Sequence, residues 1–254
     1  MKRGLMLLYG VVAYLAFFAT FMYFIAFVGN LTPVGIDSPR SGGLGVALLG
    51  NLALVLLFGA QHTIMARAPF KRWLTRHIPE AMERSTFVLA ATALLALLVW
   101  QWQPLGGLVW EVQAPALRAL LYGVYGIGWA LLLAASFTIN HFDLFGLRQA
   151  WLGFRGVPYE PIRFRNPWLY RQVRHPLYLG FFLGLWGAPT MTVTHLALAL
   201  MLSAYILFGV RFEERDLAAV HPEYGDYRAR VPMFIPGLRG SRSAAGGAVN
   251  APAA

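Results

Sequence analysis

The sequence contains no cysteine, and charged residues make up only 13% of its 254 residues. The absence of cysteine excludes a disulfide framework, a thiolate metal site and a cysteine nucleophile. The scarcity of charge, together with 58% hydrophobic residues and a mean hydropathy of +0.55, excludes an ordinary soluble globule. The chain is therefore expected to be a membrane protein.

Acidic residues are particularly few, since 11 Asp and Glu stand against 21 Lys and Arg and leave a net charge of +10. In so hydrophobic a chain, an excess of basic residues is explained by cytoplasmic loops that follow the positive-inside rule. This excess does not require a nucleic-acid partner, and we expect none. The partner that the composition predicts is the lipid bilayer.

Six apolar segments dominate the chain and predict an all-α integral membrane protein with five or six spans. They cover residues 5–28, 44–65, 86–102, 117–139, 177–189 and 193–210. The last two segments are short and are separated by an uncharged connection, which predicts a helical hairpin. The first segment follows Lys2 and Arg3, but its length and the lack of a small-residue cleavage site favour a span over a signal peptide.

The distribution of Lys and Arg tests this arrangement, because the positive-inside rule predicts that basic residues gather on one side of the membrane. Nineteen of the 21 fall in the N-terminus, in the loops after the second and fourth segments, and in the C-terminal region. Only Arg40 and Arg118 fall in segments assigned to the opposite side. We therefore expect both termini and the loop over residues 140–175 to be cytoplasmic, in a bacterial inner membrane.

The composition along the chain predicts three regions. Residues 1–139 form a four-span membrane region, and residues 140–236 combine a cytoplasmic loop, the helical hairpin and a C-terminal helix. Residues 237–254 are rich in Gly, Ala and Ser and are expected to be disordered.

Glycines in two of the apolar segments predict close helix packing. The fourth segment contains Gly123, Gly126 and Gly128, and the fifth contains the pair Gly180 and Gly184 with G-x-x-x-G spacing. Small residues allow two helix backbones to approach, either within the hairpin or between the hairpin and another span.

The loop after the fourth segment leads into the fifth through Y-R-Q-V-R-H-P-L-Y-L-G, residues 170–180. A helix is expected to begin at Pro176 with His175 as its N-cap, because proline suits the first helical position. The free N–H groups of the first turn and the charge of Arg174 favour an anion such as a carboxylate. Tyr178 falls on the same side, so Arg174, His175 and Tyr178 are expected to converge on one ligand. A basic, aromatic interface anchor would have the same composition.

The predicted topology brings polar side chains from four segments to one membrane depth. They are Gln61, His62, Asn140, His141, Asp143, His175, Tyr178, Glu213 and Glu214. For the glutamates, at the end of the last span, two alternatives stay open: Arg211 pairs with Glu214, or one glutamate faces a bound cation. His62 and His141 are expected to hydrogen-bond neighbouring loops. No histidine spacing typical of a metal site occurs, so we expect no metal.

Two motifs carry a family resemblance. R-H-P-L-Y-L-G (residues 174–180) is followed, one hairpin later, by E-E-R-D-L, H-P-E-Y-G-D-Y and V-P-M-F-I-P within residues 213–236. Together they resemble the signature of the isoprenylcysteine carboxyl methyltransferase-like membrane methyltransferases. Within this group the whole chain resembles the NnrU-related methanethiol S-methyltransferases, a match that N-H-F-D-L-F-G-L-R-Q (residues 140–149) supports.

The resemblance implies S-adenosyl-L-methionine as the cofactor, bound on the cytoplasmic side. It implies cofactor contacts at Tyr170, Arg174, His175, Pro176, Leu177, Tyr178, Glu213 and Glu214. It also implies methylation of a small volatile thiol, methanethiol, to dimethyl sulfide. In the prenylcysteine enzymes an arginine one turn before the glutamates orients the substrate carboxylate. Here that turn is Leu207-Phe208-Gly209, which fits a substrate without a carboxylate.

The thiol has to lose its proton, and His141 and Asp143 are the candidate bases on position and chemistry alone. Three other functions stay open. One is a methyltransferase for a lipid or prenylated substrate. The second is an NADPH-dependent sterol-type reductase, whose membrane fold is similar, and the third is a non-enzymatic, NnrU-like assembly factor of nitrogen-oxide metabolism.

Overall fold

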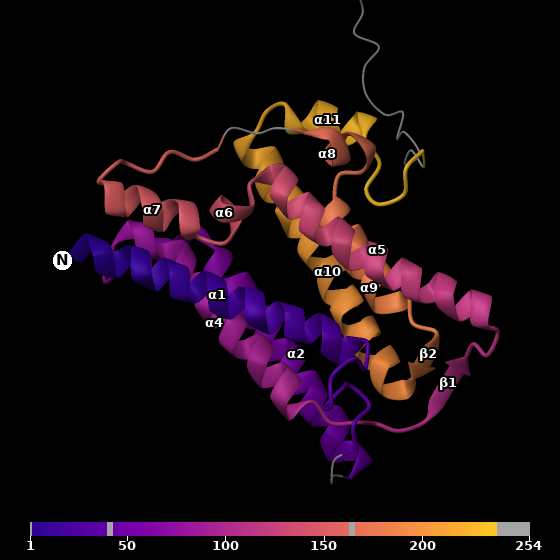
Figure 1. The fold of residues 1–254 in the computed structure, drawn as a ribbon. Coiled ribbons are helices and arrows are strands. Elements are labelled where there is room, and N and C mark those ends of the chain that lie inside the picture. The colour runs from indigo at the N-terminus through magenta and orange to yellow at the C-terminus, as the bar shows by residue number, and fades with distance from the viewer. Residues whose placement is uncertain (1, 40–42, 163–165, 238–254) are drawn as a thin grey trace, which may run out of the picture.

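The computed structural model describes residues 2–39, 43–162 and 166–237, and it is mostly helical (Figure 1). Within these ranges five helices are long and apolar enough to cross a membrane. They are α1 (Lys2–Val28), α2 (Leu44–Ala66), α4 (Glu80–Gln101), α5 (Pro115–Ile139) and α10 (Val193–Val220). The fifth apolar segment forms the shorter helix α9 (Pro176–Trp186). The prediction of an all-α integral membrane protein is confirmed.

Shorter elements occupy the predicted loops. These are α3 (Ala68–Leu74), α6 (His141–Leu144), α7 (Leu147–Arg155), α8 (Trp168–Gln172), α11 (Tyr224–Arg230) and the strands β1 (Leu108–Glu111) and β2 (Thr190–Thr192). The strands form an antiparallel pair that the sequence did not predict. The pair forms because loop backbone groups near a membrane need hydrogen-bond partners, and two loops that lie side by side supply them.

The long helices form two groups in Figure 1. Helices α1, α2 and α4 lie together, and α5 and α10 lie together with the shorter α9. Helix α1 packs against α4 and α7, α5 packs against α9, and α2 lies between α4 and α10. Helices α6, α7, α8 and α11 lie toward one end of the molecule, and the β1–β2 pair lies at the other (Figure 1). The described parts of the loop over residues 140–175 and of the C-terminal region therefore share one end, as the basic-residue pattern predicted.

The buried core lies where α1, α5 and α9 meet and is strongly aromatic. Phe21 and Phe24 both contact the Trp129 ring edge-on, with ring centroids 5.9 and 6.0 Å apart. Phe181 of α9 contacts the same indole at 5.6 Å. These contacts hold α9, which is too short to span a membrane alone, inside the helical assembly.

Helices α5 and α9 approach so closely that only glycine fits at their crossing. A Cβ atom on Gly128 would lie 2.4 Å from the backbone nitrogen of Gly184, and one on Gly180 would lie 2.6 Å from the carbonyl oxygen of Gly128. The prediction of close packing is confirmed for these three glycines, and the partner of α9 is another span. It is wrong for Gly123 and Gly126, where a Cβ would meet nothing within 4 Å, because they lie on the other face of α5.

The last long helix continues beyond the polar residues at which its span was expected to end. Helix α10 runs through Glu213 and Glu214 to Val220, because residues 211–220 include strong helix formers such as Glu, Arg, Leu and Ala. The expectation that these glutamates lie at a helix C-terminus is therefore wrong. The predicted disordered tail, 237–254, lies outside the described residues apart from Gly237.

The close contact between α5 and α9 predicts that alanine substitutions at two glycines of α5 differ sharply in their effect on stability. Gly128→Ala adds a methyl group where no space exists, so the free energy of unfolding should fall by about 1–3 kcal/mol. Gly126→Ala is the matched control and should leave stability unchanged or slightly higher, because alanine favours the helix. Thermal unfolding in detergent measures both, and equal midpoints for the two variants would contradict the packing.

Candidate functional site

A buried ionic cluster joins the start of α9 to α10. Oε1 of Glu214 accepts hydrogen bonds from Nε of Arg174 at 2.7 Å and from Nε2 of His175 at 2.9 Å. The side chains of Glu214 and Arg174 are each only 10% exposed, and that of His175 is 5% exposed. Because a carboxylate paired with arginine is an acceptor, the Nε2 atom of His175 carries a hydrogen. Glu214 is therefore held by two donors and has little freedom to move.

Arg174 also fixes the C-terminal segment. Its Nη1 donates to the carbonyl oxygens of Arg228 at 3.0 Å and Val231 at 2.7 Å. The backbone N–H groups of Arg174 and His175 donate to the carbonyl oxygens of Pro232 and Met233. The R-H-P, E-E and V-P-M-F-I-P motifs are thus parts of one contact network, which explains why they occur together.

The predicted partners of the glutamates differ from the observed ones. Glu214 pairs with Arg174 and His175, so the alternative in which it pairs with Arg211 is wrong. Tyr178 donates to Oε2 of Glu213 at 2.7 Å, and its ring stacks on His175. Arg174, His175 and Tyr178 therefore converge on two adjacent glutamates of the chain itself. Glu214 is buried and Glu213 is exposed, so Glu213 is the carboxylate that a ligand can reach.

Helix α9 begins as predicted. His175 is the N-cap, Pro176 is the first helical residue and is buried, and Leu177 packs against the core. Trp168, by contrast, is 71% exposed.

Tyr170 adds an unpaired donor beside this cluster. The phenol oxygen of Tyr170 is buried and has no hydrogen-bond partner in the described residues, while its carbonyl oxygen accepts a bond from Tyr227 at 2.6 Å. Burial, and then the charge of Glu213, raise the pKa of Tyr170, so the phenol keeps its proton. Burial also raises the pKa of Tyr227 to about 12. A buried donor without a partner marks a place where a polar group of a ligand fits.

His141 lies in a second group, on α6. Its Nδ1 is 2.8 Å from Oγ of Ser136, and its Nε2 is 2.9 Å from the hydroxyl of Tyr14. Because Ser136 donates its hydrogen to the carbonyl of Leu133, it accepts from Nδ1–H, and Nε2 accepts from Tyr14. Burial lowers the pKa of His141 and keeps the ring neutral. The expected bond to a loop is wrong, since both partners lie on long helices.

Asp143 is held on both carboxylate oxygens. Oδ1 accepts from Arg148 at 2.8 Å, and Oδ2 accepts from the hydroxyl of Tyr159 at 3.3 Å. Burial, with the charge of Asp143 as the next cause, raises the pKa of Tyr159. In the described part of the chain no direct hydrogen bond joins His141 or Asp143 to Glu213 or Glu214. The two predicted groups share one end of the molecule but are separate, and a catalytic role for His141 and Asp143 stays a prediction.

Sequence reasoning assigned no role to Tyr227, to the Val231 carbonyl or to Phe234, whose ring contacts His175 and Phe182. These residues lie within the Y-G-D-Y and V-P-M-F-I-P motifs, so the signal was present in the sequence. The motifs themselves do not indicate which partner each of these residues contacts.

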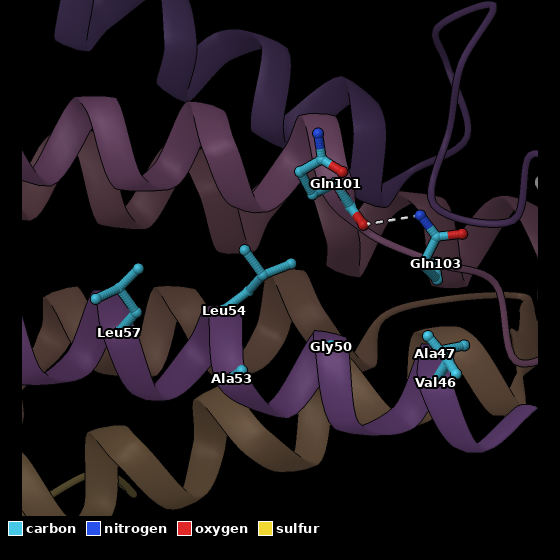
Figure 2. A pocket seen from close by; sticks show the side chains of 8 residues that line it. All are labelled: Val46, Ala47, Gly50, Ala53, Leu54, Leu57, Gln101 and Gln103. Carbon is cyan, nitrogen blue, oxygen red and sulfur yellow. Dashed lines mark hydrogen bonds between the residues drawn. The ribbon is translucent and has the colours of Figure 1, made fainter. Parts of the chain in front are cut away.

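A groove of about 430 Å³ lies elsewhere, between α2 and the end of α4 (Figure 2). Its lining residues are Val46, Ala47, Gly50, Ala53, Leu54, Leu57, Gln101 and Gln103. None of these side chains is titratable, and the groove lies in the half of α2 that is remote from the ionic cluster. It is therefore not a candidate for the chemistry.

The two adjacent glutamates should respond differently to substitution. Glu214→Ala leaves the buried guanidinium of Arg174 without its carboxylate and should lower the free energy of unfolding by about 3–5 kcal/mol. Glu213→Ala removes an exposed carboxylate and one hydrogen bond, which should cost about 1 kcal/mol. Thermal unfolding in detergent without cofactor separates the two, and an equal loss in both variants would contradict the assignment.

Comparison with known proteins assigns the chain to a family. It is 47% identical over 238 residues to methanethiol S-methyltransferase of Mycobacterium tuberculosis, covering 93% of this chain and 98% of that protein. It is 49% identical to methanethiol S-methyltransferase 2 of Bradyrhizobium diazoefficiens, over 93% and 92% of the two chains. Nurim of Sus scrofa is 29% identical over 79% of this chain and 84% of its own length.

No protein-family model matches the chain, and no solved structure gives a significant match. The identity to the bacterial enzymes nevertheless extends along almost the whole of both sequences. The chain belongs to the methanethiol S-methyltransferase family.

Proposed function

We propose that this protein transfers a methyl group from S-adenosyl-L-methionine to methanethiol and so forms dimethyl sulfide. The observation that carries the proposal is the cluster of Glu213, Glu214 and the start of α9, in a chain 47% identical to an enzyme of that name. Residues 140–236 are the methyltransferase core, and residues 1–139 form the membrane region that supports it. Both termini and the site face the cytoplasm of a bacterial inner membrane, since the charged donor has to enter from water.

The residues around Glu213 suit this cofactor. The exposed carboxylate of Glu213 is an acceptor for an amino or hydroxyl group, and the unpaired hydroxyl of Tyr170 is a donor. The rings of Tyr170 and Tyr178 offer aromatic faces to a cation, an interaction that stabilises a desolvated ligand by about 2 kcal/mol. When bound, S-adenosyl-L-methionine supplies an electrophilic methyl group on a positively charged sulfur.

The other predicted cofactor residues position the helices that carry the site. Arg174, His175 and Glu214 are engaged with one another, so their role is to hold the start of α9 against α10. Pro176 and Leu177 begin α9 and orient its first turn, from which Tyr178 reaches Glu213.

Methyl transfer between a sulfonium and a thiolate needs in-line geometry and a dry environment but no nucleophilic side chain. Because the two charges neutralise each other in the transition state, a low dielectric favours the reaction. The apolar helices α9 and α10 provide such surroundings beside Tyr178 and Glu213.

A small thiol fits the acceptor side better than a carboxylate-bearing substrate. No arginine occurs in the turn over residues 207–209. Near the start of α9, the ring of Phe182 packs on Phe234, which also contacts His175, so these surroundings are apolar. Methanethiol offers almost no polar group, so selection depends on size, and one methylene is worth only about 1–3 kcal/mol.

Purified protein with S-adenosyl-L-methionine should therefore convert methanethiol to dimethyl sulfide in a headspace assay, and ethanethiol more slowly. The rate should rise with pH because the thiolate is the reactive form. Methylation of a prenylcysteine or phospholipid with no thioether from methanethiol would replace the proposal by the lipid-modifying function. Binding of neither the donor nor its demethylated product would favour an assembly factor.

The unpaired hydroxyl of Tyr170 gives a test of the cofactor site. Tyr170→Phe should weaken donor binding about tenfold, the effect of one hydrogen bond, without lowering thermal stability, because that hydroxyl has no partner within the described residues. Glu213→Gln should weaken binding about 10- to 100-fold by removing a charged acceptor. Calorimetry measures both, and wild-type affinity in both variants would place the donor elsewhere.

A further inference from the structure

His62 lies near the end of α2 and has an unused ring nitrogen. Its Nδ1 atom is buried and has no hydrogen-bond partner among the described residues. The ring packs against Phe58 and Phe87, with centroid distances of 5.1 and 4.9 Å. Burial of a polar atom without a partner costs free energy, so such an atom in a native fold calls for a functional explanation.

Among the described residues, no other candidate base has a buried side-chain nitrogen or oxygen atom without a hydrogen-bond partner. His141 uses Nδ1 on Ser136 and Nε2 on Tyr14, and Asp143 has both oxygens engaged. His175 uses Nε2 on Glu214. His195 lies at the opposite end, next to β2, with Nε2 on the carbonyl of Leu185. Proton transfer to His141 would first require that its bond with Tyr14 break.

The end of α2 packs alongside the part of α10 that carries the glutamates. The hydroxyl of Tyr205 lies 3.4 Å from Oγ1 of Thr63, and Arg67 pairs with Asp216 at 2.8 Å. The guanidinium of Arg67 also lies 5.2 Å above the ring of Phe212. Since residue numbers rise together along the contact, the two helices run parallel.

Helix geometry places His62 and Glu213 on the same side of this contact. Successive residues of a right-handed helix are rotated by about 100°. When two such helices run parallel, the residue before a contact residue on the first helix therefore points to the same side as the residue after a contact residue on the second. His62 precedes Thr63, and Glu213 follows Phe212. Phe87 of α4 meets His62 on that side, and Tyr178 of α9 meets Glu213 there.

His62 also lies deeper in the apolar layer than Glu213. Thr63 is level with Tyr205, so the side chains of His62 and Glu213 are offset by roughly 12–14 Å along the helix axis. This offset is comparable with the length of S-adenosyl-L-methionine. A donor anchored at Glu213 that extended along α10 by this distance would bring its methyl group to the depth of His62, in the layer from which an apolar thiol arrives.

We propose that Nδ1 of His62 is the base that accepts the proton of the thiol, an inference that rests on the proposed function. The S–H bond breaks and its proton moves to Nδ1. The thiolate sulfur then bonds to the methyl carbon while the bond from that carbon to the donor sulfur breaks, and its electron pair stays on the donor sulfur. The products are the thioether and the uncharged, demethylated donor, and the imidazolium returns its proton to water.

The helices around His62 carry charged and titratable groups. Arg84 of α4 interacts electrostatically with His62, and its guanidinium lies 4.7 Å over the ring of Phe87. On α10, Tyr205 contacts Thr63, the residue after His62, and farther along that helix Glu213 accepts a hydrogen bond from Tyr178 of α9.

The test uses His62→Asn, because the asparagine amide occupies the place of Nδ1 but does not titrate. In single-turnover reactions with bound donor, this variant should be roughly 10²- to 10⁴-fold slower than wild type at neutral pH. The deficit should shrink as pH rises and the thiol ionises unaided, while calorimetric affinity for the donor stays at the wild-type value. His77→Asn, at an exposed histidine, is the matched control and should keep the wild-type rate.

A second readout needs no turnover. In ¹³C-histidine-labelled protein with the demethylated donor bound, the ring resonance that His62→Asn removes should shift when methanethiol is added. If His62→Asn does not fold, His62→Gln takes its place in both measurements.

Three results would overturn the assignment: a wild-type rate in the His62 variant, a deficit that does not change with pH, or a pH-rescued deficit in His141→Asn instead. A wild-type protein that forms no thioether from any thiol would refute the proposed function itself, which distinguishes the two failures.

Discussion

The buried pairing of Arg174 with Glu214 is the interaction on which the geometry of the candidate site depends. Burying two charges costs more than their attraction returns unless the remaining polar atoms are also satisfied. Here the guanidinium donates to two further carbonyl groups, and the carboxylate also accepts from His175. The start of α9, the middle of α10 and the C-terminal segment are thereby locked together, and the neighbouring Glu213 is left facing outward.

A second constraint, the glycine contact between α5 and α9, sets the depth of this cluster. Gly180 lies beside Leu132 and Gly187 beside Tyr125, so the two helices are antiparallel. The start of α9 is therefore level with the end of α5, and the groups around His141 and Glu214 occupy the same end of the molecule. Shared depth follows from backbone packing alone, which is why it holds without a hydrogen bond between the groups.

The parts of this structure that could be predicted from sequence are those whose determinants are local. Long apolar runs define spans, and a proline after a polar residue defines the start of α9. The parts that could not be predicted depend on a partner far along the chain. Glu214 is 40 residues from Arg174, and Tyr14 is 127 residues from His141. The i, i+3 spacing within one helix suggested Arg211 as the partner of Glu214. The observed partner is Arg174, because its guanidinium also donates hydrogen bonds to two backbone carbonyl groups.

The large sequence separation between the members of this network also determines when it can form during synthesis of the chain. Arg174 is bonded to residues 40 and 57 positions later, so its partners do not yet exist when α9 leaves the ribosome. Until α10 and the segment beyond it are made, the guanidinium has to stay in water, where its charge is solvated. The ionic cluster can therefore form only after the first four apolar segments and α10 have been made, and the nascent chain acquires the candidate site late in its synthesis.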